Sequence, residues 1–544
     1  MDPIKKIILF GDFAGKDFDD FWHRDYLYIK TSALLRLSYM LRKKGYIVKQ
    51  VHHCTSFNRD ELNHILDEFS EGQQILVGIS SSFLSSVNKI DYNFHASDRE
   101  EAKDWPEGGF WGAKAFEFLT NICQLSKAKN FPLLMGGFDV LKYKFWTVED
   151  VYAWGLDMLT SYVDYFVIGN NTDIIEKVCN HEKFRFEPLR GSLSRKPAKI
   201  AYSQPIQDYS DVANTVMPYD IVSEGECLIT EIAAGCVFSC SFCTYSNLGK
   251  QKSQYARTYD SFKNEIVSNW ENFGVRVYQM TDNMINDWSA KLEYLARVRD
   301  ETGIDVRWSG YARLDTIQKR QQARMFKESG CAGVVFGIES QTKEVGPYIG
   351  KMTDHKKIVD LLHQFRDEIG DYAITSGSYI AGAPGESKEQ LAATYEWLQS
   401  PEGRNLIDHF IFTPLFITPG INDLNDINRS RQDPFRDYKL VEGEISKRGI
   451  GWTSPWGKYE DFLKIAIDYS KWLNKSTTVE EAMVALRGPF AIPQMQNFLP
   501  GGVERFVASI RAKEPIHYLY AKEMRKKNNQ MISYYRQKTL GNKY

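Results

Sequence analysis

The first part of the chain alternates short apolar runs with longer stretches of helical periodicity. The apolar runs, rich in β-branched and aromatic residues, lie at 5–11, 46–53, 74–83, 131–139 and 163–170. Between them, stretches such as 32–45 and 59–72 repeat apolar residues every three or four positions, as amphipathic helices do. Continuous apolar strands separated by helices are typical of a parallel sheet buried on both faces. Residues 1–200 are therefore predicted to form a doubly wound, Rossmann-like α/β domain of five strands.

A second alternating series follows a stretch that has no periodicity. Residues 190–225 are rich in Ser, Pro and Gly, and we place the interdomain linker at 201–225. Six apolar runs then lie at 227–235, 276–283, 305–313, 332–340, 373–383 and 408–418. Helical patterns separate them at 259–273, 288–302, 315–329, 353–369 and 386–399. This strict alternation predicts a partial (β/α)6 barrel over 226–420, with an active site at the C-terminal ends of its strands.

Three further stretches stand apart from this alternation. Residues 84–112 are polar and aromatic and follow the third apolar run, in a position where long insertions are more often functional than accidental. Residues 421–544 are irregular at first and then mainly helical. Their last part, 522–544, carries seven Lys or Arg against one Glu. We expect this part to be the solvated face of a charged helix rather than a nucleic-acid interface.

Composition adds few constraints. Hydrophobic residues make up 43% and charged residues 25% of the 544 positions, as in ordinary globular proteins. The formal net charge of -2 gives no global field that would attract nucleic acid or an anionic membrane. The first apolar run is too short for a signal sequence, and no later stretch reaches 18 uncharged apolar residues. We expect a soluble cytoplasmic protein that has no membrane partner.

The cysteines carry the clearest chemical signal. The chain has eight, too few for a disulfide scaffold, and three of them fall within eight positions as Cys236, Cys240 and Cys243. Three thiolates on one tight loop can bind three irons of a [4Fe–4S] cubane and leave the fourth iron open. A structural zinc site would need a fourth protein ligand, but no His or Cys occurs within 30 residues after Cys243. A ferredoxin-type cluster would need a fourth cysteine.

The C-x3-C-x2-C spacing, with Phe242 just before the third cysteine, resembles the signature of the radical S-adenosylmethionine (SAM) superfamily. The resemblance implies that the open iron of the cluster chelates SAM. It also implies that reductive cleavage of SAM gives a 5′-deoxyadenosyl radical. A reductase such as flavodoxin or ferredoxin would then be the electron donor.

The resemblance extends over the rest of the predicted barrel. Residues 336–340, Phe-Gly-Ile-Glu-Ser, look like the family's fourth-strand segment, and residues 382–386, Gly-Ala-Pro-Gly-Glu, look like its fifth-strand turn near the adenine. Taken singly, such side chains are equally typical of strand ends, helix caps and surface ion pairs. In this order on successive strands they imply cofactor contacts for Phe242, Asp282, Arg313, Glu339, Ser340, Gly382 and Glu386. No catalytic side chain is singled out beyond these contacts.

The N-terminal domain resembles the cobalamin-binding domain found in B12-dependent radical SAM enzymes. Gly136 and Gly137 match its Gly-Gly turn, and Ser80 lies where that fold places a serine. The D-x-H-x-x-G loop of cobalamin domains is missing, because residues 11–16 contain no His, and His23 is more typical of a loop or a core. A methylthiotransferase would carry a second cysteine triad here, a pattern that the scattered cysteines of this domain do not form.

Three functions remain open at this point. The leading one is a radical SAM transferase that uses a [4Fe–4S] cluster, SAM and cobalamin to methylate or rearrange an unactivated carbon. The alternative is a cobalamin-free radical SAM enzyme whose N-terminal domain binds the substrate. The third is a non-catalytic binding protein with an iron–sulfur or zinc site. No motif identifies the substrate, small or macromolecular.

Overall fold

The structure of the chain is a computed structural model. It describes residues 2–12, 29–81, 113–137, 140, 157–169, 172–189, 198–204, 206, 208–243, 250–351, 354–415, 439–440, 452–470, 492–498, 501–512 and 517–541. Among these residues, no helix combines the length and the apolar character needed to cross a membrane. His23, which the sequence assigns to a loop or a core, and the 84–112 insertion lie outside the described residues.

Contacts divide the chain into two compact units. The first comprises Met1–Gln207, Asp211–Glu224 and Asn528–Tyr544, and the second comprises Asp208–Ser210 and Gly225–Lys527. The boundary at Gly225 lies at the end of the linker expected from the sequence. The expected C-terminal region is not a unit of its own, because its last part groups with the first unit and the remainder groups with the barrel.

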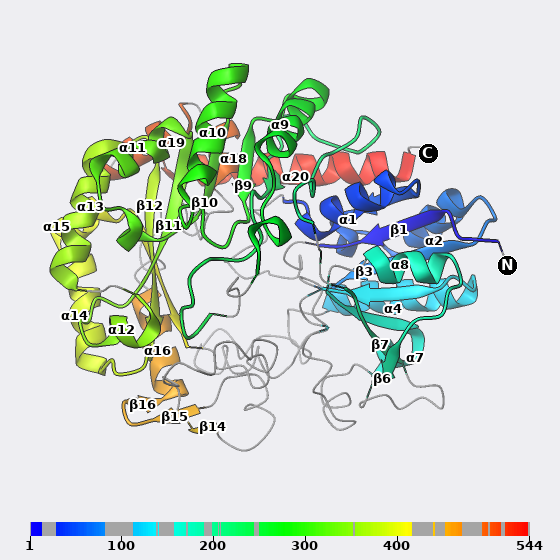
Figure 1. Cartoon of the computed structure of the whole chain (residues 1–544), viewed down its shortest axis with the longest axis horizontal. Helices are drawn as coiled ribbons and strands as arrows, with labels where there is room; N and C mark the ends of the chain where they lie inside the picture. Colours follow the sequence, from blue (N-terminus) through cyan, green and yellow to red (C-terminus); the bar gives the residue numbers. More distant parts are fainter. Residues whose placement is uncertain are drawn as a thin grey trace. The chain divides into compact units, whose positions relative to one another are not determined.

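The first unit is built on a mainly parallel sheet with strand order β2-β1-β3-β4-β5-β7-β6 (Figure 1). The five predicted strands are present as β1 (Lys6–Phe10), β2 (Ile47–Val51), β3 (Ile75–Ser80), β4 (Leu133–Gly136) and β5 (Tyr165–Ile168). Alternate residues of β1 enter different cores: Ile8 lies in one hydrophobic cluster and Ile7 in another. A strand buried on both faces explains the continuous apolar run and confirms the doubly wound architecture.

Two strands beyond the predicted five extend this sheet. The strand β7 (Lys199–Tyr202) pairs parallel with β5, and β6 (Phe186–Pro188) pairs antiparallel with β7. All of β6 is exposed, and only Ile200 and Ala201 of β7 are buried. Because β7 has only these two buried apolar residues, it does not appear as an apolar run in the sequence and was not predicted. The expected border of this domain at residue 200 therefore falls inside a strand.

Helices cover both faces of the first sheet. They are α1 (Ser32–Lys43), α2 (Arg59–Ser70), α4 (Ala113–Ala128), α7 (Asp157–Tyr162) and α8 (Thr172–Cys179), with a short 3-10 turn, η1 (Cys54–Ser56). Apolar residues of α1 and α8 share one core cluster, and those of α2 and α4 share the other. A capping box between Asn58 and Glu61 satisfies backbone groups at the start of α2.

The C-terminal helix α20 (His517–Gly541) begins in the second unit and ends in the first. Within the first unit its residues Asn528, Met531, Tyr535 and Thr539 are buried. Their spacing of three and four places them on one side of the helix. The expectation of a merely solvated, charged helix is therefore wrong for this part of it. The buried stripe is half polar, so the hydrophobic pattern did not reveal it.

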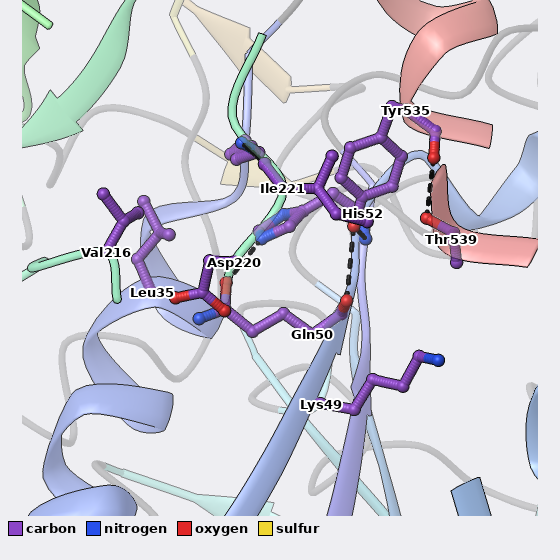
Figure 2. Close-up of a pocket in the computed structure, with 10 residues that line it drawn as sticks. Leu35, Lys49, Gln50, His52, Val216, Asp220, Ile221, Tyr535 and Thr539 are labelled. Carbon is purple, nitrogen blue, oxygen red and sulfur yellow. Dashed lines mark hydrogen bonds between the residues drawn. The ribbon is translucent and has the colours of Figure 1, made fainter. Parts of the chain in front are cut away.

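Tyr535 ties α20 to the end of β2. Its hydroxyl accepts a hydrogen bond from the His52 N–H at 2.9 Å and donates one to the Gln50 carbonyl at 3.2 Å (Figure 2). The His52 ring accepts from the Thr31 N–H through Nδ1, and burial lowers the pKa of His52 well below its usual value. The cavity beside these groups measures about 10 Å³, room for about one water molecule. This part of the molecule is a structural anchor.

Replacing Tyr535 with phenylalanine should lower the free energy of unfolding by about 1–3 kcal/mol, because the buried His52 N–H would lose its acceptor. Urea denaturation measures the loss. The neighbouring Tyr534 is 40% exposed, so Tyr534→Phe should change that free energy by less than about 0.5 kcal/mol. Equal effects of the two variants would contradict the anchoring role.

The second unit is built on six parallel strands in the order β13-β12-β11-β10-β9-β8 (Figure 1). They are β8 (Leu228–Thr230), β9 (Val277–Met280), β10 (Arg307–Ala312), β11 (Cys331–Glu339), β12 (Ile374–Ala381) and β13 (His409–Pro414). Five of the six strands fall within predicted apolar runs, and β11 begins one residue before its run at 332–340. The order follows the chain, as in a (β/α) barrel, so the predicted partial barrel is confirmed.

The helices between these strands also match their predicted positions. They are α9 (Tyr259–Phe273), α10 (Ser289–Thr302), α11 (Arg320–Glu328), α13 (His355–Ile369) and α14 (Lys388–Gln399). Side chains of Thr258 and Ser387 cap the starts of α9 and α14, and glycines follow the ends of α9 and α10. Shorter elements are η3 (Lys252–Gln254), η4 (Leu314–Thr316), α12 (Val345–Ile349) and α15 (Pro401–Leu406).

Elements from beyond residue 420 complete the second unit. They are the antiparallel strands β14 (Lys439–Leu440), β15 (Trp452–Ser454) and β16 (Gly457–Lys458), and the helices α16 (Tyr459–Ser470), α18 (Ile492–Phe498) and α19 (Gly502–Arg511). Trp452 is fully buried and donates a hydrogen bond from its indole N–H to the Leu415 carbonyl. Ile492 of α18 lies against Gly333 of β11, where a Cβ would come within 2.3 Å of it.

Candidate active site

The three clustered cysteines lie on the loop that follows the first barrel strand, β8. Cys236 and Cys240 are 7% and 8% exposed, and Cys243 is partly exposed, as is Phe242 beside it. Burial raises the pKa of the Cys236 thiol to about 11, so a bound metal would have to stabilise its thiolate. Within the described residues, no three potential ligands surround a single ion. Three thiolates on one loop are the donor set of a [4Fe–4S] cubane, because each of them binds a different iron.

A second loop, after β9, holds the cysteine loop in place. Asp282, Asn283 and Asp287 of this loop each accept hydrogen bonds from backbone N–H groups of the cysteine loop. The donors are Ile232 and Ala233 to Asp282 (both 2.9 Å), Gly235 to Asn283 (2.9 Å) and Val237 to Asp287 (3.2 Å). These side chains fix the backbone on the N-terminal side of the cysteines and at Val237 within their loop.

Lys291 of α10 pairs with both carboxylates that hold the cysteine loop, those of Asp282 and Asp287. Its Nζ lies 3.1 Å from Asp282 Oδ1 and 2.8 Å from Asp287 Oδ1, and it donates to the Met284 carbonyl at 2.8 Å. All three charged side chains are almost fully buried. Burial raises the pKa of the Asp282 carboxyl, and the Lys291 ammonium opposes that rise. Both carboxylate oxygens of Asp282, predicted to contact a cofactor, are thus engaged by the chain itself.

Arg313, just after β10, contacts the cysteine loop directly. Its Nη1 donates to Cys240 Sγ at 3.4 Å, and its guanidinium carbon lies 4.2 Å from the centre of the Phe238 ring. Two hydrogen bonds from Nε (2.6 Å) and Nη2 (2.8 Å) join it to the Asp315 carboxylate, and Nη2 also donates to the Gly350 carbonyl at 2.8 Å. Arg313 therefore sits beside a proposed cluster ligand.

Glu339 ends β11 in an unusual backbone conformation. Its φ is +69°, in the left-handed region that non-glycine residues rarely adopt, and the pairing of β11 with β12 shifts register between Gly337 and Glu339. The Lys351 Nζ lies 3.4 Å from Glu339 Oε1 and donates to the Gly337 carbonyl at 2.7 Å. Burial raises the pKa of the Glu339 carboxyl, and Lys351 opposes that rise. Strained backbone of this kind is concentrated at ligand sites.

The predicted segments on β11 and β12 meet through Glu386. The Ser340 hydroxyl donates to Glu386 Oε1 at 2.5 Å, and the Thr342 hydroxyl donates to the same oxygen at 3.2 Å. Glu386 is fully buried, and burial raises its pKa to about 7. Its other oxygen, Oε2, has no hydrogen-bond partner among the described residues. The structure thus joins two motifs that the sequence separates by some forty residues.

The unfolding free energy should fall by roughly 3 kcal/mol as the pH rises from about 4.5 to about 7. In this window the folded chain retains the Glu386 proton that the unfolded chain has released. The contribution is fully present below pH 4.5 and lost above pH 7. Glu386→Gln should remove the slope in urea unfolding measured across this range, whereas the exposed control Glu389→Gln should keep it. If the unfolding free energy of Glu386→Gln still falls over this pH range, another group causes the pH dependence.

Gly382 adopts a φ of +83°, and a Cβ there would lie 2.7 Å from Trp452 and 2.9 Å from Phe462. Because Gly382 has no side chain, the C-terminal elements can pack directly against it.

Besides the expected residues, the site contains several that sequence reasoning missed, namely Asn283, Asp287, Lys291, Asp315, Gly350 and Lys351. The i, i+4 spacing of Asp287 and Lys291 is the one sequence signal among them.

The first unit contains a cavity of about 170 Å³ at the sheet and α1. Ser80, Gly136 and Gly137, predicted from the sequence to bind a cofactor, all line it, together with Gly78 and Gly169. No histidine occurs among the described residues that line it. In the loop after β1, the buried Asp12 carboxylate accepts hydrogen bonds from the Thr55 N–H and hydroxyl, and residues 13–16 lie outside the described residues.

Sequence comparisons agree with this geometry. The family model of the radical SAM superfamily matches residues 230–398. An uncharacterized methyltransferase of Pyrococcus horikoshii is 27% identical over 187 residues, which are 34% of this chain and 39% of that protein. The bacteriochlorophyllide d C-12(1)-methyltransferase of Chlorobaculum tepidum is 26% identical over 242 residues, 42% of this chain and 49% of that protein. The chain therefore spans less than half the length of these curated relatives.

Solved structures match this chain over nearly its whole length. The radical SAM methyltransferase TsrM from Kitasatospora setae, solved with cobalamin and a [4Fe–4S] cluster, has a TM-score of 0.57 at 16% identity and covers 97% of this chain and 99% of its own. The cobalamin-dependent SAM radical enzyme OxsB, solved with aqua-cobalamin and SAM, has a TM-score of 0.53 at 11% identity, covering 99% and 80%. At these identities the likeness is one of fold. The stretch that matches the family model, residues 230–398, lies within the second unit and contains the three clustered cysteines.

Proposed function

We propose that the chain is a radical SAM transferase that uses cobalamin to methylate or rearrange an unactivated carbon. The observation that carries the proposal is the braced loop at the carboxyl end of β8, which presents Cys236, Cys240 and Cys243 as ligands for a [4Fe–4S] cluster. When bound, the cluster would supply the electron that cleaves SAM to a 5′-deoxyadenosyl radical, and cobalamin would carry the methyl group.

For SAM we propose contacts at the carboxyl ends of the later strands. The Glu339 carboxylate can accept hydrogen bonds from hydroxyl or ammonium groups, and the Lys351 ammonium beside it favours its charged form against the effect of burial. Phe242, Ser340 and Glu386 complete the proposed set, with the Glu386 bond fixing the Ser340 hydroxyl. For Asp282 and Gly382 we propose supporting roles instead, because the chain's own groups occupy their surroundings.

For cobalamin we propose the cavity of the first unit, held by Ser80, Gly136 and Gly137. Two adjacent residues without Cβ atoms let a large ligand approach the backbone, and Gly137 has a φ of +107° that favours glycine. The position at the carboxyl ends of parallel strands is where such sheets bind ligands. None of the described residues that line this cavity is a histidine.

The missing D-x-H-x-x-G sequence at residues 11–16 favours a second candidate function. In it, the chain is a cobalamin-free radical SAM enzyme, and the cavity of the first unit receives the substrate. For both functions the reaction needs an external one-electron donor, for which we propose a flavodoxin or ferredoxin. The substrate itself, small or macromolecular, is not specified by the site residues.

Anaerobic purification and reconstitution tests the proposal. Iron, sulfide and corrinoid are quantified, and 5′-deoxyadenosine and methylated product are followed after SAM and dithionite are added. A cluster, deoxyadenosine and bound corrinoid together would support the cobalamin-dependent function. Deoxyadenosine without corrinoid would support the cobalamin-free alternative. A loaded cluster without SAM turnover would favour a non-catalytic binding protein, and absence of a cluster would overturn the assignment.

Glu339→Gln should weaken SAM binding about 10- to 100-fold and leave the iron content unchanged, because it removes a charged acceptor worth about 1.5–3 kcal/mol. Isothermal titration of the reconstituted protein with SAM measures the affinity. Glu344→Gln is the matched control, since Glu344 is exposed and lies only five residues away. Unchanged SAM affinity in Glu339→Gln would remove Glu339 from the site.

A further inference from the structure

The guanidinium of Arg313 is held by hydrogen bonds to other groups of the chain. Of its five guanidinium N–H donors, four are used: one by Cys240 Sγ, two by the Asp315 carboxylate and one by the Gly350 carbonyl. The side chain is 7% exposed and lies over the Phe238 ring. One N–H on Nη1 is all that the described residues leave for a ligand such as the SAM carboxylate.

We propose that Arg313 sets the reduction potential of the cluster through its hydrogen bond to the Cys240 sulfur, rather than by binding SAM. The inference rests on the proposed function, because it requires a cluster on Cys240. Arginine is always charged in proteins, so the sulfur has a cation and a donor beside it at every accessible pH. Hydrogen bonds to cluster sulfurs and nearby charge are established determinants of iron–sulfur potentials.

The direction of the effect follows from charge. One-electron reduction makes the cluster and its thiolates more negative, so a neighbouring cation and an N–H donor stabilise the reduced state more than the oxidised state. Arg313 therefore raises the reduction potential of the cluster, which makes the cluster easier to reduce. Asp315 moderates this effect, because its carboxylate partly neutralises the guanidinium while holding it in position.

The test is a redox titration of the reconstituted full chain with dithionite, monitored by electron paramagnetic resonance. Arg313→Met should shift the midpoint potential to a more negative value, and Arg313→Lys should recover part of that shift. The matched control is Arg307→Met, which removes a buried arginine from the other end of β10. Arg307 bonds the Gly330 and Tyr372 carbonyls and the Glu504 carboxylate, so its loss should leave the potential unchanged.

A spectroscopic signature separates tuning from folding. The wild-type reduced cluster should show a hyperfine-coupled proton that exchanges in D2O, and Arg313→Met should lose it. A loaded Arg313→Met with the wild-type potential and the same exchangeable proton would overturn the inference. If Arg313→Met assembles no cluster, Asp315→Asn decides, because it both loosens the guanidinium and removes the carboxylate that offsets its charge: a changed coupling of the exchangeable proton or a changed potential supports the inference, and a variant in which both are unchanged overturns it. A wild-type chain without a cluster would instead refute the proposed function.

Discussion

Replacing Cys240 with alanine should abolish cluster assembly and, with it, all cleavage of SAM. Cys240 is the middle of three proposed ligands on one short loop, and two thiolates cannot hold three irons of a cubane. No other cysteine can substitute, because the remaining five are buried structural thiols in other elements. Iron and sulfide content, with the visible absorption of the reconstituted protein, should fall from about four irons per chain to background.

Cys331→Ala provides the matched control for losing a buried thiol. Cys331 opens β11 in the same unit, is fully buried, and has its pKa raised to about 12 by burial. Its replacement leaves a small cavity and should cost stability while sparing the cluster. A Cys240→Ala chain that loads iron as fully as Cys331→Ala would refute the ligand assignment. Circular dichroism of both variants checks that each is folded.

Replacing Lys291 with methionine should lower the free energy of unfolding by about 3–5 kcal/mol. The variant leaves two buried carboxylates, Asp282 and Asp287, without their shared cation in a site that excludes water. These carboxylates also hold the cysteine loop, so cluster loading should fall together with stability. Chemical denaturation measures the first effect and iron content after reconstitution measures the second.

An exposed ion pair gives the comparison for Lys291. Lys263 pairs with Glu301 at 2.7 Å, but both side chains are about one-third exposed, so Lys263→Met should cost less than about 1 kcal/mol. Neutralising one partner in the double variant Lys291→Met/Asp287→Asn should recover part of the lost stability. If Lys291→Met lowers the free energy of unfolding no more than Lys263→Met does, the buried ion pairs of Lys291 do not stabilise the fold.

Much of the fold could be predicted because its strands are buried on both faces. All six barrel strands and β1 to β5 appear in the sequence as continuous apolar runs, which depend on local composition alone. The strands β6 and β7 lie at the sheet edge and bury too few residues to produce such a run. The buried side of α20 was missed for a related reason, since Asn528 and Thr539 contribute to it and the many lysines suggested solvent.

In the candidate site, too, local features could be predicted from the sequence and contacts between distant residues could not. The cysteine spacing is local, so the sequence alone identified the loop. The pairing of Ser340 with Glu386 matched two motifs placed on neighbouring strands, although their contact with SAM stays a prediction. By contrast, the Arg313 bond to Cys240 joins residues 73 positions apart, and only the folded chain brings them together. A carboxylate at a strand end, as in Asp282, looks the same in sequence whether it binds a ligand or the backbone.

The path of α20 has a consequence for how the protein is made. Its residues from Asn528 onward belong to the first unit, yet the ribosome synthesises them only after the whole of Gly225–Lys527. The first unit therefore cannot complete its own interior as it emerges, although domains commonly fold in order of synthesis. Until Tyr535 arrives, the end of β2 would offer an unfilled surface to chaperones.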